Sequence, residues 1–164
     1  MSGTEKLSAF YYPHENHRWI GISETAYKKE EKGFQSIKAQ PRFKGVVRVE
    51  LATNQVETKF HVRYFEISQG GHSTFERHQH AHVVIGKRGR GVVLAGGEVY
   101  NLEEDDLLII NKGTPHQLIN QEKEPFGFYC IVDAERDSPR PIIRKEFEEL
   151  LKKNPKIEEV IEPK

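Results

Sequence analysis

The stretch between residues 43 and 132 consists of short runs of β-branched and aromatic residues, each ended by glycine, asparagine or acidic residues. Such runs are typical of antiparallel strands joined by turns. They read VVRVEL, FHVRYFEI, FERHQHAHVVI, GVVLA, EVYNL, DLLII, HQLIN and GFYCIV. Gly96 and Gly97 separate two of them and predict a hairpin, because the favoured two-residue turns require positive φ. Since no helical periodicity interrupts the runs, the sequence predicts an all-β barrel or sandwich.

Two flanking segments differ from this pattern. Residues 1–42 are polar, and we expect them to form an N-terminal extension that packs on the barrel or on a partner subunit. Residues 133–164 contain PIIRKEFEELLKK, which predicts a C-terminal helix that ends near Asn154 and is followed by a tail. The apolar residues on one face of that helix are Ile143, Phe147, Leu150 and Leu151. The 164 residues therefore predict one domain, with its barrel at residues 43–132.

Composition argues against several classes of protein. Lysine plus arginine and aspartate plus glutamate number 25 each, so the net charge indicates neither nucleic-acid nor anionic-membrane binding. The longest aliphatic run, Leu107–Ile110, is far too short to cross a membrane, and the polar first residues do not resemble a signal peptide. We therefore expect a cytoplasmic protein. Cys130 is the single cysteine, which excludes an intramolecular disulfide, and its apolar neighbours predict a buried, inert thiol.

Three histidines occupy every second position of HQHAH, at His78, His80 and His82. Because side chains alternate along a strand, we expect all three on one face. Buried imidazoles need partners for their ring nitrogens, and one metal ion would serve all three. The alternative is a solvent-exposed polar face, or core histidines bonded to backbone groups. If the histidines face into the barrel, Val83 and Ile85 lie on the opposite face of the strand and point outward. The N-terminal segment or a second subunit must then cover them.

A fourth histidine, His116, lies in DDLLIINKGTPHQLIN, a stretch that resembles the second sequence motif of the cupin superfamily. Gly113, His116 and Asn120 match the motif residue for residue. Asp105 and Asn111 stand where the motif has glycine and proline. The match places His116 at the position of the motif's histidine.

The stretch GGHSTFERHQHAHVVIGKRG is similar to the first cupin motif. His78 and His80 align best with its His-x-His pair, while Gly71 and Gly89 correspond to its outer glycines. His82 falls at the position of the motif's glutamate, a replacement that some small cupins share. The interval that separates this position from the His-x-His pair is shorter than in the motif.

The resemblance to a small single-domain, conserved-barrel cupin implies a double-stranded β-helix, or jelly-roll barrel, with one metal ion inside. It implies that the ligands are His78, His80, His82 and His116. Imidazole suits several divalent transition metals, so iron, manganese, nickel, zinc and copper all stay open. Small cupins usually pair through sheet faces, which implies a homodimer.

Four neutral ligands leave the positive charge of the ion uncompensated, which favours a small anionic molecule as the binding partner. We therefore expect a metal-dependent enzyme, a dioxygenase or an isomerase, that acts on a small anionic metabolite. The alternative is a non-catalytic cupin that binds or senses a small ligand and uses the metal structurally. The basic run KRGR at residues 87–90 is interpreted as a solvated turn rather than a phosphate site.

Overall fold

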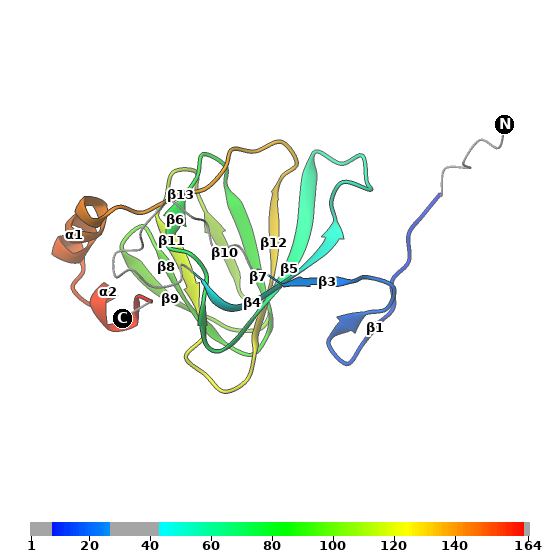
Figure 1. The fold of residues 1–164 in the computed structure, drawn as a ribbon, viewed down its shortest axis with the longest axis horizontal. Coiled ribbons are helices and arrows are strands. Elements are labelled where there is room, and N and C mark those ends of the chain that lie inside the picture. The colour runs from blue at the N-terminus through cyan, green and yellow to red at the C-terminus, as the bar shows by residue number, and fades with distance from the viewer. Residues whose placement is uncertain (1–7, 27–42, 163–164) are drawn as a thin grey trace.

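The computed structural model describes residues 8–26 and 43–162 (Figure 1). It forms a nearly closed antiparallel barrel, with the N-terminal hairpin on one side and two C-terminal helices on the other. This architecture confirms the predicted all-β, jelly-roll class of fold. Residues 1–7 and 27–42, which fall in the predicted N-terminal extension, lie outside the described residues.

Ten strands and bridges make up the barrel region. They are β4 (Lys44–Ala52), β5 (Phe60–His72), β6 (Glu76–Arg77), β7 (His82–Arg88), β8 (Gly91–Ala95), β9 (Glu98–Leu102), β10 (Leu107–Ile110), β11 (His116–Ile119), β12 (Phe126–Asp133) and β13 (Arg140–Pro141). The sheet runs in the order β10-β7-β12-β5-β11-β6-β13, with β4 also on β5, and with β8 on β11 and β9 on β8. β5 pairs with β12 along most of its length and reaches β11 through His72. One long strand thus links both parts of the barrel.

The alternation of side chains divides each central strand into an inward and an outward face. Arg63 of β5 pairs with Cys130 of β12, which in turn pairs with Val84 of β7, so these three side chains share the inner face. At one end of the barrel this face is apolar and forms the main core. Its buried members are Val46, Ile67, Val84, Val93, Leu102, Ile110, Leu118, Phe126 and Phe128. Further along β4 and β5 the inner face becomes polar, and that region holds the site.

The N-terminal hairpin packs on the outside of this wall. It consists of β1 (His14–Glu15) and β2 (Arg18–Trp19), and β3 (Glu24–Ala26) then pairs with β4. Trp19 contacts Tyr64 and Tyr129, with ring centroids 4.9 and 6.0 Å apart. Both tyrosines therefore lie on the outer face rather than in the barrel.

The C-terminal segment covers a second outer surface. Helix α1 (Arg144–Lys153) ends one residue before Asn154, as predicted, and it buries Leu150 against β8 and β11. Ile143 precedes the helix and is exposed, unlike the other three predicted contact residues. The tail contains a further helix, α2 (Ile157–Val160), that the sequence pattern did not predict. Ile157 and Ile161 of this tail are buried in the same cluster.

The hairpin predicted at Gly96 and Gly97 joins β8 to β9, and both glycines have positive φ, at 61° and 93°. The predicted turn is confirmed. Within the described part of the chain, neither helix has the length and apolar character required to span a bilayer.

Glu146 connects α1 to the barrel. Its carboxylate accepts hydrogen bonds from Arg140 at 2.7 and 3.1 Å and from the Ile143 amide at 2.9 Å, and it lies 2.8 Å from Arg77. The Arg140 hydrogen bond is the main reason that the pKa of Glu146 is lowered from 4.5 to about 2. Because the folded-state pKa is depressed, the ionised carboxylate stabilises the fold above pH 4.5 and this stabilisation is lost as the pH falls toward 2.

We expect Glu146→Gln to lower the free energy of unfolding at pH 7 by about 1–3 kcal/mol, the range for a hydrogen-bonded charged group. The difference from the wild type should narrow below pH 4.5, where the wild-type carboxylate begins to lose its advantage. Urea denaturation across this pH range measures both effects. Glu148→Gln is the control, because Glu148 forms an exposed pair with Arg144 at 3.0 Å whose loss should cost less than about 0.5 kcal/mol. Equal losses in the two variants would contradict the assignment.

Candidate metal centre

The sequence predicted one continuous strand through the histidine-rich stretch, but the structure contains two. β6 ends at Arg77 and β7 begins at His82, with residues 78–81 in an irregular segment between them. Hydrogen bonds from distant parts of the chain hold that segment. The Gly113 amide donates to the His78 carbonyl at 2.6 Å, and the Gln79 amide donates to the Asp137 carboxylate at 2.8 Å. The interruption lets the histidines leave the simple alternation of a strand.

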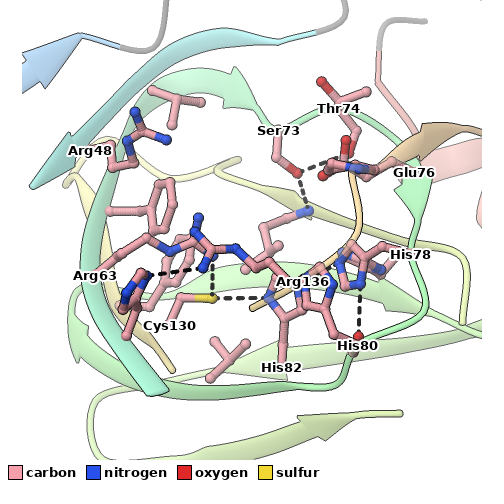
Figure 2. Close-up of a pocket in the computed structure, with 18 of the residues that line it drawn as sticks. Arg48, Arg63, Ser73, Thr74, Glu76, His78, His80, His82, Cys130 and Arg136 are labelled. Atoms are coloured by element: carbon pink, nitrogen blue, oxygen red, sulfur yellow. Dashed lines mark hydrogen bonds between the residues drawn. The ribbon is translucent and has the colours of Figure 1, made fainter. Parts of the chain in front are cut away.

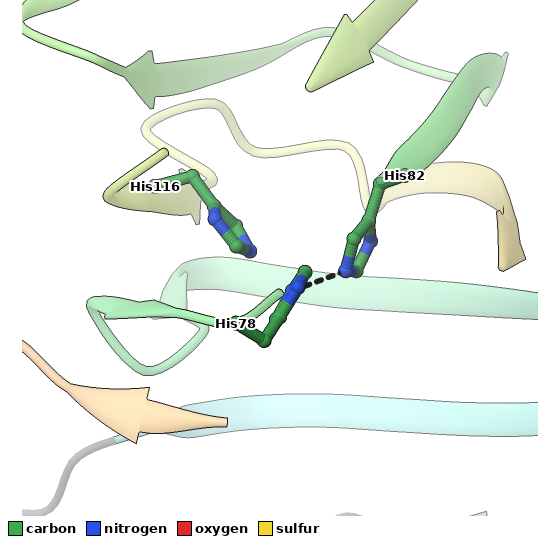
Figure 3. A group of neighbouring side chains, drawn as sticks. All are labelled: His78, His82 and His116. Atoms are coloured by element: carbon green, nitrogen blue, oxygen red, sulfur yellow. Dashed lines mark hydrogen bonds between the residues drawn. The ribbon is translucent and has the colours of Figure 1, made fainter. Parts of the chain in front are cut away.

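Three histidines converge inside the barrel, and we call them the histidine cluster: His78, His82 and His116 (Figure 3). They come from the irregular segment, from β7 and from β11. One ring nitrogen of each lies within 4.8 Å of the others, and the Nε2 atoms of His78 and His82 are 2.5 Å apart. His78 and His116 are buried, and His82 is half-buried. Both predicted motifs thus contribute to one cluster.

Hydrogen bonds fix the tautomers of two of these rings. Nδ1 of His78 lies 2.8 Å from the His80 carbonyl, and Nδ1 of His116 lies 2.9 Å from the Thr114 carbonyl. A carbonyl oxygen accepts but cannot donate, so each Nδ1 carries the proton and each Nε2 presents a lone pair. With lone pairs directed into one small space, the cluster is suited to a metal ion.

His80 occupies a different position. Its ring stacks on His78 with centroids 3.7 Å apart, and its Nδ1 lies 2.7 Å from an Asp137 carboxylate oxygen. The other Asp137 oxygen accepts from Gln79, and these two bonds lower the pKa of Asp137. His80 is not one of the three residues with mutually close donor atoms. A carboxylate on the second ring nitrogen is nevertheless the arrangement commonly found around metal-bound histidine.

Burial keeps the imidazoles neutral. It is the first cause of the lowered pKa values of all three rings in the cluster, and it brings that of His78 to about 4. Repulsion between neighbouring histidines adds to the effect. Neutral imidazole is the form that binds metal, so the cluster is in its ligand form at neutral pH.

Cys130 is buried, as the sequence predicted, and its thiol lies beside the cluster. Its Sγ is 2.9 Å from Nδ1 of His82 and 3.5 Å from Nη2 of Arg63. Burial raises the pKa of this thiol, so it stays protonated at neutral pH. The sulfur atom joins the histidine side of the site to the arginine side.

A cavity of about 460 Å³ lies beside the histidines. Figure 2 shows Arg48 and Arg63 on the side of the cavity opposite the histidines. In this view Arg136 lies between those two arginines and the histidines. Arg48 and Arg63 project from β4 and β5, whereas Arg136 comes from the loop that follows β12. These residues were not singled out from the sequence. For Arg48 and Arg63, the available signal was their place at alternate, inward positions of VVRVEL and FHVRYFEI. The sequence carries no comparable signal for Arg136.

The remaining histidines have separate environments. His61 lines the cavity, with its Nδ1 3.0 Å from Arg136. His72 is buried at the end of β5 and bonds the Ser73 carbonyl, whereas His14 contacts Trp19 on the outer surface. Of these three histidines, His61 is therefore the one that lines the cavity.

Comparison with known proteins supports the motifs independently. Residues 63–132 match the model of the cupin domain family. Over 125 residues, which are 76% of this chain and 74% of the relative, the sequence is 40% identical to the 1-methylthio-D-xylulose 5-phosphate methylsulfurylase of Rhodospirillum rubrum.

Solved structures show the same fold. A cupin-2 domain from Rhodospirillum rubrum has 34% identity and a TM-score of 0.75, covering 91% of this chain and 93% of that one. A cupin 2 conserved barrel domain protein from Rhodopseudomonas palustris has 31% identity and a TM-score of 0.80, covering 93% of this chain and 99% of that one.

Proposed function

Because this chain belongs to the cupin family, we propose that it is a metal-dependent enzyme that acts on a small anionic metabolite. The observation that carries the proposal is the convergence of three neutral imidazoles beside a cavity of about 460 Å³. A cavity of this size suits a small metabolite, and the histidine cluster supplies donors for a metal at its wall.

We propose His78, His82 and His116 as ligands of one divalent transition metal, with His80 as the fourth. The first three have converging donor atoms, and the Asp137 carboxylate holds the Nδ1 proton of His80 and orients its ring. When bound, the ion supplies a Lewis acid that polarises an oxygen atom of the substrate. Imidazole donors leave iron, manganese, nickel, zinc and copper as candidates.

The protein supplies the environment for that chemistry. Phe65 and Phe128 stack at a centroid distance of 5.5 Å and line the cavity, so part of its wall excludes water. His61 also faces the cavity, where burial and the neighbouring arginines lower its pKa and keep its ring neutral. A small anion can therefore be held between apolar and cationic surfaces.

The name of the Rhodospirillum rubrum relative supports a narrower class of substrate. That protein is a methylsulfurylase of 1-methylthio-D-xylulose 5-phosphate, a phosphorylated sugar with a methylthio group. We propose a phosphorylated ketose of this class as the substrate here, in place of the oxygenation or isomerisation substrates that the sequence alone favoured.

One metal ion per chain is expected in protein purified without chelators. His78→Ala, His82→Ala or His116→Ala should each reduce the metal content at least about tenfold, because each removes a donor from the same set. Elemental mass spectrometry measures the content, and His72→Ala is the control, since His72 is a buried histidine outside the cluster. Full occupancy in His116→Ala would refute the ligand set.

Metal-loaded protein should consume 1-methylthio-D-xylulose 5-phosphate, whereas His116→Ala should not. Phosphorus NMR and mass spectrometry follow the substrate and its product, and His72→Ala again tests whether the loss is specific. If the loaded wild type binds this compound without converting it, or converts none of a panel of phosphorylated ketoses, the enzyme proposal falls. A cupin that only binds or senses its ligand then replaces it.

We also propose that the protein is a homodimer that pairs through the outer face of β7 and β10. Leu107 pairs with Ile85 and Ile109 pairs with Val83, so the four side chains share this outer face. β10 is an edge strand, and its apolar side chains Leu107 and Ile109 are 60% and 58% exposed. Such an apolar edge favours association with another copy.

A dimeric mass is expected from light scattering at micromolar concentration, and Ile109→Glu should shift it toward the monomer. The introduced carboxylate would have to be desolvated in the interface, which weakens association. Ile143→Glu is the matched control, because Ile143 is 53% exposed and precedes α1 on another surface. A monomeric wild type, or equal shifts in both variants, would contradict the proposed interface.

A further inference from the structure

The cavity contains a second group of functional side chains, apart from His78, His82 and His116, that we call the arginine cluster: Arg48, Arg63 and Arg136. Strand register explains two of its members. Arg48 pairs with Phe65, and Arg63 pairs with Cys130, and both partners are inward-facing residues that line the cavity. Arg136 is held in its loop by hydrogen bonds from Nη1 to the Asp133 carbonyl at 2.9 Å and to His61 at 3.0 Å.

Among the residues that the structure describes, a carboxylate pairs with one member of this cluster and not with Arg63 or Arg136. Arg48 has a carboxylate partner in Glu50, at 3.7 Å. The groups that contact the Arg63 guanidinium are neutral, namely the Cys130 thiol at 3.5 Å and the Phe65 ring at 5.2 Å. Its Nε is buried and makes no hydrogen bond within the described structure, as is also true of Nε in Arg48, Arg77 and Arg88. A buried guanidinium donor without an acceptor is costly unless a ligand provides one.

The acidic residues on the cavity wall serve other contacts. Asp137 is engaged by His80 and by the Gln79 amide, and Glu76 lies on β6 next to the histidines. Burial, followed by repulsion from Arg63, lowers the pKa of Arg136, and Arg48 lowers it further. Glu50 opposes this effect but is the smallest of its causes. Arg63 and Arg48 thus both repel Arg136, at a position where an anion would relieve the repulsion.

We propose that the arginine cluster binds the phosphate group of the substrate as a dianion, so that the other end of the molecule faces the histidine cluster. Planar guanidinium groups offer paired N–H donors that match phosphate oxygens, and three of them can surround one phosphate. Both clusters line the same cavity of about 460 Å³, which places the two ends of one small molecule within one enclosure. The phosphate assignment follows from the arginines, whereas the orientation of the reacting end rests on the proposed function.

The basic turn at residues 87–90 provides the contrast. Arg88 lies 3.2 Å from Glu66 and 3.9 Å from Glu124, and Arg90 lies 2.6 Å from Glu122 and 3.7 Å from Glu103. Each of these arginines already has two carboxylate neighbours. They therefore have the carboxylate partners that Arg63 and Arg136 lack in the described part of the chain, and Arg90 makes a suitable control.

Calorimetric titration with inorganic phosphate tests the subsite, using the full-length protein both as purified and after removal of metal with a chelator. We expect saturable binding in both forms, since the arginines do not depend on the metal. Arg63→Met and Arg136→Met should each weaken binding about tenfold to a hundredfold, and Arg90→Met should leave it unchanged. Circular dichroism melting checks that each variant is folded. If Arg63→Met does not fold, the phosphate affinity of Arg136→Met tests the proposal, because Arg136 lies in a loop rather than in a strand of the barrel. Absence of phosphate binding, or unchanged affinity in the folded arginine variants, would overturn the proposal.

Titration with D-xylulose 5-phosphate and with unphosphorylated D-xylulose distinguishes the phosphate from the sugar. The phosphorylated compound should bind the metal-free protein at least tenfold more tightly, and Arg136→Met should abolish that preference. If this preference is seen but 1-methylthio-D-xylulose 5-phosphate is not consumed, the proposed reaction fails and the phosphate subsite stands. If the compound is consumed with an unchanged KM by Arg63→Met and Arg136→Met, the subsite fails and the reaction stands.

Discussion

The mutual approach of three buried imidazoles is the constraint on which the rest of the site depends. His78 and His116 must each direct an Nε2 lone pair inward, because backbone carbonyls take their Nδ1 protons. Protonation cannot relieve the crowding at neutral pH, since burial lowers the pKa of every ring in the cluster. A shared cation would satisfy the converging ring nitrogens at once, which is the basis for proposing these rings as metal ligands.

The loop after β12 couples this cluster to the rest of the cavity. Asp137 reaches back to His80 and to the Gln79 amide, and its neighbour Arg136 bonds His61 on the opposite side. A single loop of residues 134–139 therefore positions groups on both walls. Displacement of this loop would disturb the orientation of His80 and the arginine cluster together.

Stability is supplied away from the polar cavity. The apolar end of the barrel packs around Phe126 and Ile67, while the C-terminal helices bury a second cluster around Ile157 on the outer face. Gln117 joins the two regions, because its side-chain amide donates to the Ser73 and Glu162 carbonyls at 3.0 and 2.6 Å. Burying arginines and histidines is unfavourable, and these apolar contacts offset that cost.

Local patterns in the sequence determined the strand runs, the glycine hairpin, helix α1 and the two histidine motifs, because each depends on residues close together in the chain. Three features depended on tertiary structure. The strand breaks between His78 and His82 where Gly113 and Asp137 supply its hydrogen bonds, and no local signal contains those partners. Helix α2 forms where Ile157 finds the outer face of the barrel. The arginine cluster joins residues of two strands and a distant loop, so only closure of the barrel brings their charges into one cavity.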